Sequence, residues 1–176
     1  MGMDSLDKLT ILGIAALVIY TAVLLFSTDD QVRAGMDEKK KAAVAVHVLT
    51  PELETKIRTA RSLLQQDNLD KSMSLVESLL SQYPYEGELY LLRGDILVRR
   101  QQPVAAMYEY REAISLNPDY LDKKTPRFQG KKIKNTVEEA MTAIQAGLVR
   151  DPGNSKLKAD REVVYYMKRK IAGSCG

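Results

Sequence analysis

Three prolines, Pro84, Pro118 and Pro152, lie 34 residues apart, and the stretch before each can be aligned with the other two. A period of about 34 residues is typical of arrays of helix-turn-helix units. One such unit cannot bury its apolar face alone, so neighbouring units stack on one another. The spacing therefore predicts an all-α helical-repeat domain over 51–176. Its units are 53–84, 87–118 and a degenerate 121–152, followed by a capping helix at 153–171.

The middle unit has the most regular alternation of large and small residues. Large and small side chains alternate up to a final proline, in the order Tyr90, Gly94, Leu97, Ala106, Tyr110, Ala113 and Pro118. Small residues let two antiparallel helices approach closely, and large residues fill the adjoining gaps. In these residues the chain resembles the tetratricopeptide repeat (TPR) family. The resemblance implies a right-handed stack of helix pairs. Arg93 stands where the family usually has leucine, and we expect its guanidinium to reach solvent.

The two outer units match this pattern in part. Thr50 and Pro51 predict the N-cap and the first residue of a helix, and the first unit has Ala60, Leu63, Ser72, Val76 and Leu79 at the matching places. The third unit matches only near its end, at Ala140, Ile144, Gly147 and Pro152. Pro126 and Gly130 disfavour a regular helix over 122–134, so we expect a loop or a short distorted helix there.

Residues 9–26 form 18 consecutive residues without a charge. As a helix this run would be about 27 Å long, enough to span a hydrocarbon core. The alternative is a cleaved secretory signal. However, the apolar run is longer than the apolar region of a usual signal peptide, and no small-x-small cleavage site precedes Ser27. We interpret 1–26 as a tail with an uncleaved transmembrane anchor and 27–50 as a charged connector.

Two arguments give opposite predictions for the side of the membrane on which the domain lies. Basic residues after the span, including Arg33 and Lys39, place the C-terminal part in the cytoplasm by simple counting. The resemblance to N-terminally anchored bacterial TPR proteins instead implies the periplasmic side of an inner membrane. Our expectation leans slightly toward the periplasm.

Charge is uneven within a mildly basic chain whose formal net charge is +3. Nucleic-acid binding would need a sharper basic footprint, so it is not expected. One stretch, the predicted basic loop, holds six basic residues, Lys123, Lys124, Arg127, Lys131, Lys132 and Lys134. It is either a solvated loop or a contact for an acidic partner or anionic lipid headgroups.

Catalytic and metal-binding chemistry lacks its usual residues in this chain. His47 is the single histidine and Cys175 the single cysteine, so no metal-ligand spacing and no base beside a nucleophile can be found. No glycine-rich phosphate loop is present either. The sequence predicts that the protein is not an enzyme and uses no cofactor or metal.

The resemblance implies that the first helices of the units line a groove for a peptide. On matching positions the predicted groove residues are Ile57, Arg58, Arg61, Leu64, Leu91, Asp95, Val98 and Arg99. This set mixes charges, and the lysine and asparagine set that clamps a C-terminal carboxylate in some family members is absent. Some of these residues could instead pack against other parts of the chain.

The expected function is a membrane-tethered scaffold or adaptor that binds a partner protein or peptide, in the assembly or maturation of a membrane or exported protein. Tethering raises the effective concentration of a short groove at the membrane. The alternative function is a permanent structural accessory subunit of a membrane complex. A scaffold should have transient clients, whereas a subunit should co-purify in fixed stoichiometry.

Overall fold

The computed structural model describes residues 50–173, which lie within a compact unit from Val46 to Gly176. The expected anchor at 9–26, most of the connector and Cys175 lie outside the described residues. Within 50–173, none of the helices combines the length and the apolar composition that crossing a membrane requires.

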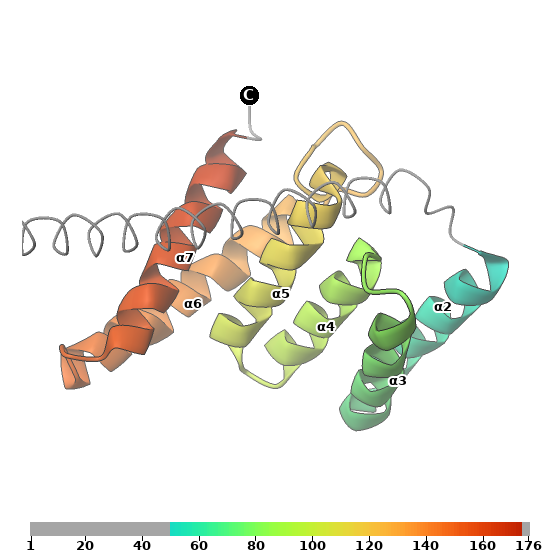
Figure 1. Cartoon of the computed structure of the whole chain (residues 1–176), viewed down its shortest axis with the longest axis horizontal. Coiled ribbons are helices and arrows are strands. Elements are labelled where there is room, and N and C mark those ends of the chain that lie inside the picture. The colour runs from blue at the N-terminus through green and yellow to red at the C-terminus, as the bar shows by residue number, and fades with distance from the viewer. Residues whose placement is uncertain (1–49, 174–176) are drawn as a thin grey trace, which may run out of the picture. The chain divides into compact units, whose positions relative to one another are not determined.

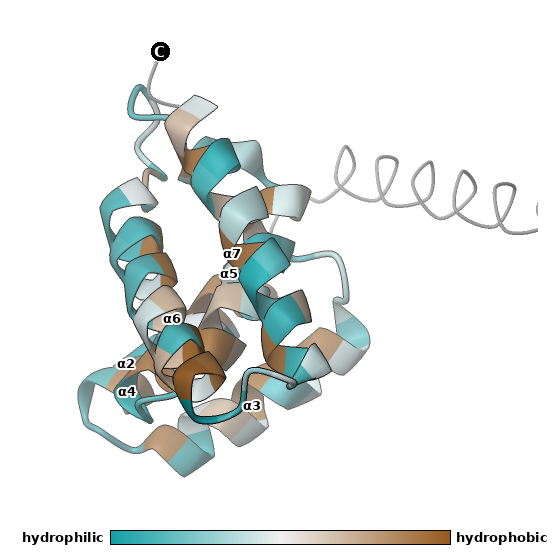
Figure 2. Cartoon of the chain, turned by 90° about the vertical axis from the view of Figure 1, so that its left-hand side faces the viewer, coloured by the Kyte–Doolittle hydropathy of each residue, from teal (hydrophilic) through white to brown (hydrophobic). Residues whose placement is uncertain are grey.

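The described chain is all-helical, with six α-helices and one short 3-10 helix (Figure 1). In chain order the elements are α2 (Pro51–Gln65), α3 (Leu69–Gln82), α4 (Gly87–Arg99), α5 (Pro103–Leu116), η1 (Pro118–Tyr120), α6 (Gly130–Arg150) and α7 (Ser155–Gly173). Each helix packs against the next one along the chain, and α2 also contacts α4. Figure 2 shows hydrophilic and hydrophobic stretches alternating along the helices, as expected where each helix buries one face.

The turns within the first two helix pairs repeat one another at the spacing of the prolines. Asp67 lies in the turn after α2 with φ 61°, and Gln101 lies in the turn after α4 with φ 56°; these are the two positive φ values of non-glycine residues in the described chain. The N–H of Asn68 donates to the Leu63 carbonyl, and the N–H of Gln102 donates to the Leu97 carbonyl, both at 2.9 Å. The predicted period is thus present in local backbone geometry.

Helix starts follow the local sequence. Thr50 caps α2, because its hydroxyl accepts a hydrogen bond from the Leu53 N–H at 3.3 Å and Pro51 occupies the first turn. Pro103 likewise lies in the first turn of α5, where its missing N–H removes no helical hydrogen bond. The predicted start of the first helix is confirmed.

The close approach of α4 and α5 depends on Gly94. A Cβ atom at this position would lie 2.6 Å from Cδ1 of Tyr110, and still closer to Cε1. Tyr110 and Ala106 are both fully buried. In the first pair, Ser72 stands at the place of Ala106 and is also fully buried, and its hydroxyl donates to the Ala60 carbonyl at 2.8 Å. The size pattern predicted from sequence is therefore the packing pattern of the helix pairs.

The expected loop over 122–134 ends earlier than predicted. Residues 121–129 connect η1 to α6, but α6 begins at Gly130, so Lys131, Lys132 and Lys134 belong to a helix. Glycine is tolerated there because it is at the helix start and approaches another side chain closely; a Cβ atom would lie 2.7 Å from Cζ of Phe128. The prediction of an irregular stretch was correct for Pro126 and wrong for the three lysines.

Arg93 and Tyr108 connect neighbouring helices. The Arg93 side chain, expected to reach solvent, pairs with Glu109 of α5 at 2.6 Å and stacks over Tyr90. The Tyr108 hydroxyl donates a hydrogen bond to the buried Asp160 of α7 at 2.7 Å. This hydrogen bond links α5 to α7, in addition to the apolar contacts between these helices.

Candidate functional site

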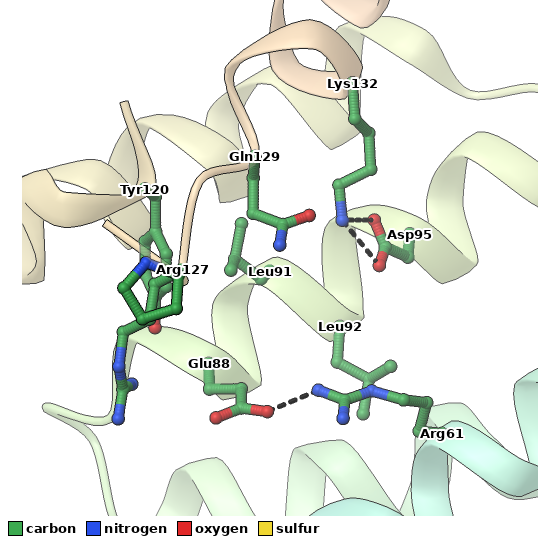
Figure 3. A pocket seen from close by; sticks show the side chains of 10 residues that line it. Arg61, Glu88, Leu91, Leu92, Asp95, Tyr120, Arg127, Gln129 and Lys132 are labelled. Carbon is green, nitrogen blue, oxygen red and sulfur yellow. Dashed lines mark hydrogen bonds and ion pairs between the residues drawn. The ribbon is translucent and has the colours of Figure 1, made fainter. Parts of the chain in front are cut away.

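A cavity of about 460 Å³ opens over one face of α4 (Figure 3). Its floor comes from Glu88, Leu91, Leu92 and Asp95. These residues are three, one and three positions apart, so they share one face of the helix. The two leucines are nearly buried, whereas both carboxylates are partly exposed. The floor is thus apolar in the middle and acidic at both ends.

Four further segments form the walls of this cavity, which we call the α4 pocket. α2 contributes Arg61, η1 contributes Tyr120, and α6 contributes Lys132. The connecting segment contributes Pro126, Arg127 and Gln129. The backbone N–H of Gln129 donates to the Tyr120 carbonyl at 2.7 Å, which fixes the end of this segment beside η1.

Both carboxylates of the α4 pocket are already paired with a cation. Glu88 forms an ion pair with Arg61, and Asp95 forms one with Lys132 at 2.7 Å. Asp95 also accepts a hydrogen bond of 2.6 Å from the Tyr110 hydroxyl, and Lys132 lies over the Tyr110 ring at 5.6 Å. Burial, together with the neighbouring Asp95 carboxylate, raises the pKa of Tyr110 above its usual range. The Asp95 end of the pocket is therefore a rigid, preorganised cluster.

Tyr120 and Arg127 differ from the paired residues of the α4 pocket. The Tyr120 side chain is only 3% exposed, and its hydroxyl makes no hydrogen bond of regular geometry within residues 50–173, although the Arg127 side chain lies close enough to act on its pKa. Burial, with Glu86 and Glu88 nearby, raises the pKa of Tyr120 to about 12, although Arg127 opposes the rise. No carboxylate of the described chain pairs with Arg127. The exposed Arg127 guanidinium is therefore open to a ligand, whereas the Tyr120 hydroxyl is covered.

The charges of the α4 pocket favour an anionic ligand. Three cations, Arg61, Arg127 and Lys132, face two carboxylates that are both engaged. A carboxylate from a partner would meet the Arg127 guanidinium. The leucines beneath provide an apolar contact for the rest of the ligand.

The pocket brings together residues that the sequence had assigned to two separate features. Arg61, Leu91 and Asp95 belong to the predicted groove, whereas Arg127 and Lys132 belong to the predicted basic loop. The connecting segment and the start of α6 fold over the face of α4. The groove and part of the basic stretch are therefore one site.

Other predicted groove residues lie elsewhere. Ile57 and Leu64 are buried in the core shared by α2, α3 and α4, and Val98 packs against a separate core formed mainly by α5, α6 and α7. Arg58 pairs with Glu54 on its own helix, and Arg99 pairs with Asp67 at 3.6 Å. The family positions place these residues on the right helices, but three of them are packing residues.

The remaining basic residues, Lys123, Lys124, Lys131 and Lys134, do not line the α4 pocket. Five pocket residues, Glu88, Leu92, Tyr120, Pro126 and Gln129, are not among the predicted site residues. Glu88 and Leu92 share the α4 face of Leu91, so helical periodicity could have found them. The other three lie in η1 and the connecting segment. Their signal was weak, because only the fold of the connecting segment brings them over α4. Pro118 and Pro126, which bracket an irregular stretch, were the one hint that a fixed connection lay there.

Comparison with known proteins does not assign the chain to a family. No protein-family model matches the sequence, and no curated protein is similar to it.

Proposed function

We propose that the protein is a membrane-tethered scaffold of the TPR type, whose α4 pocket binds an acidic peptide segment of a partner protein. The anchor is the apolar run at 9–26, and the partner is a client in the assembly or maturation of a membrane or exported protein. The repeated turn geometry at Asp67 and Gln101 and the tight fit of Gly94 against Tyr110 support the TPR assignment.

The observation that carries the binding proposal is the state of the charges in the α4 pocket. Arg127 is exposed and has no carboxylate partner in the described chain, whereas Glu88 and Asp95 are both paired already. A ligand carboxylate would pair with Arg127, while Glu88 and Asp95 disfavour deep entry of a second acidic group.

The test uses the full chain in its native membrane. A photoreactive amino acid replaces Gln129, which lines the pocket, or, as a control, Glu77, which is exposed on α3. We expect discrete protein adducts from position 129 and none from position 77. Arg127→Glu should lower the adduct yield roughly tenfold or more, because a charge-assisted hydrogen bond is lost and a repulsion is gained.

Lys124→Glu is the matched control for the charge reversal. It lies in the same connecting segment, is exposed and does not line the pocket, so the adducts should persist. Equal loss of adducts in both variants would refute pocket binding. If the partner co-purifies with the unreacted protein in fixed stoichiometry, the accessory-subunit alternative replaces the scaffold.

A further inference from the structure

Basic side chains gather at one end of the domain, where three segments meet. These segments are the connection 121–129, the first turns of α6 and the last turns of α7. Figure 1 draws the connection and the C-terminal end of α7 at the same end of the domain, and Leu121 lines a surface hollow together with Arg169 and Lys170. Lys134 and Lys168 line one surface hollow together, which confirms that α6 and α7 meet there. We call this surface the basic end; its cations are Lys123, Lys124, Lys131, Lys134, Lys168, Arg169 and Lys170.

Most cations of the basic end have no acidic partner. In the described chain no carboxylate pairs with Lys123, Lys124, Lys131, Lys168 or Arg169. Lys134 reaches Glu138 only at 3.9 Å, and Lys170 lies over the Tyr166 ring. Elsewhere in the domain, ion pairs are shorter and more numerous: Arg93 and Arg100, for example, pair with carboxylates of other helices. The charge of the basic end is therefore left for something outside the domain.

Helix electrostatics do not account for these charges. Basic residues near the end of α7 complement its dipole, as is usual. Lys131, Lys132 and Lys134 instead stand at the start of α6, where the dipole disfavours cations, and the first turn of α6 contains no acidic residue. The helix dipole therefore does not stabilise these cations. Lys132 pairs with Asp95, Lys134 approaches Glu138, and Lys131 has no acidic partner in the described chain.

Two hollows with apolar walls flank the last turns of α7. One, of about 290 Å³, is lined by Val137, Ile171 and Ala172. The other, of about 520 Å³, is lined by residues that include Ile114, Leu121 and Tyr166. Lysine and arginine side chains also line both hollows, and Glu138 lines the smaller one. Apolar recesses with several cations beside them match a surface with anionic headgroups above hydrocarbon.

We propose that the basic end of the domain lies on an anionic phospholipid surface. The cations contact lipid phosphates, and the hollows beside Tyr166 and Ile171 receive parts of the lipids. Each basic residue near such a surface strengthens association about fivefold, so several acting together orient a domain firmly. A tether at 9–26 would keep this surface near the bilayer. The lipid contact is independent of what the α4 pocket binds, because Lys131 and Lys168 are not part of that pocket.

The experiment reconstitutes the full chain into nanodiscs of neutral phosphatidylcholine or of phosphatidylcholine with phosphatidylglycerol. Hydrogen exchange of backbone amides is then compared between the two. We expect exchange over 121–134 and 166–173 to slow at least about fivefold in the anionic discs and to recover in high salt. Co-elution with neutral discs separately tests the anchor.

Charge-reversal variants with equal net charge provide the control. Lys124→Glu, Lys131→Glu and Lys168→Glu together should abolish the difference between the two lipids. Lys71→Glu, Arg150→Glu and Lys158→Glu together remove the same charge from exposed positions away from the basic end and should preserve it. Equal exchange in both discs for the native chain would overturn the proposal. Protection by single-stranded RNA as strong as by anionic discs would also overturn it, since the surface would then not be selective for lipid.

Discussion

Gly94→Ala adds one methyl group at the point where α4 and α5 come closest. In an open helix this change would stabilise by about 1 kcal/mol, because alanine is the better helix former. Here the new Cβ would lie 2.6 Å from Cδ1 of Tyr110, well inside the distance of 3.5–4.0 Å at which carbon atoms pack. We therefore expect the sign of the effect to reverse.

The magnitude follows from how firmly the Tyr110 ring is held. The ring is fully buried, and its hydroxyl is bonded to Asp95, so it cannot swing away without breaking that bond. Overpacking a core costs about 1–3 kcal/mol, and a fixed ring places this site in the upper part of that range. After the gain in helix propensity, the net loss of unfolding free energy should be about 1–2 kcal/mol.

A double-mutant cycle isolates this contact. In a Tyr110→Leu background the aromatic atoms nearest Gly94 are gone and the shorter side chain can rotate, so Gly94→Ala should cost at least about 1 kcal/mol less than in the native background. Urea unfolding of the fragment 46–176, followed by far-UV circular dichroism, measures all four variants. The same loss in both backgrounds would show that Gly94 is not required by Tyr110, and the explanation of the size pattern would be wrong.

Two further substitutions test polar groups that the fold leaves in unusual states. Tyr120→Phe should raise the unfolding free energy at pH 7 by about 1 kcal/mol, because it removes a buried hydroxyl that makes no regular hydrogen bond. The pKa of Tyr120 is raised from 10.0 to about 12 in the folded state, so its contribution to the unfolding free energy is complete below pH 10 and is lost as the pH rises toward 12. Urea unfolding at pH 7 and pH 11 should therefore show a smaller alkaline loss of unfolding free energy in Tyr120→Phe than in the native chain. Tyr108→Phe should lower the unfolding free energy by about 1–2 kcal/mol, because the buried Asp160 of α7 would keep its contact with Lys156 but lose the tyrosine hydroxyl. As a control, Tyr165→Phe at an exposed position of α7 should change the thermal midpoint little.

Sequence alone was sufficient for the helical pairs and their local geometry. The 34-residue period, the small residues Gly94 and Ala106 and the prolines at helix starts act through neighbours on the same or the adjacent helix. Such contacts are short in sequence, so a periodic pattern specifies them. For the same reason the start of α2 at Thr50 could be predicted.

The irregular stretch was harder to predict, because its structure depends on position rather than composition. Gly130 would disrupt a helix interior, but it begins α6, where glycine costs little and its missing Cβ makes room for Phe128. The residue types in this stretch do not by themselves specify the residue at which α6 begins. Three lysines were therefore assigned to a loop and belong to a helix.

The α4 pocket is the feature that only the tertiary structure decided. Its floor lies along one face of α4, so helical periodicity could predict part of it, including Leu91 and Asp95. Its walls come from residues up to about 70 positions apart, and Tyr120 and Arg127 reach α4 only because the connecting segment folds over it. No local pattern encodes that contact, since it arises from the packing of α6 against α5. The sequence determined which helices form, and the packing between them determined which charges share a site.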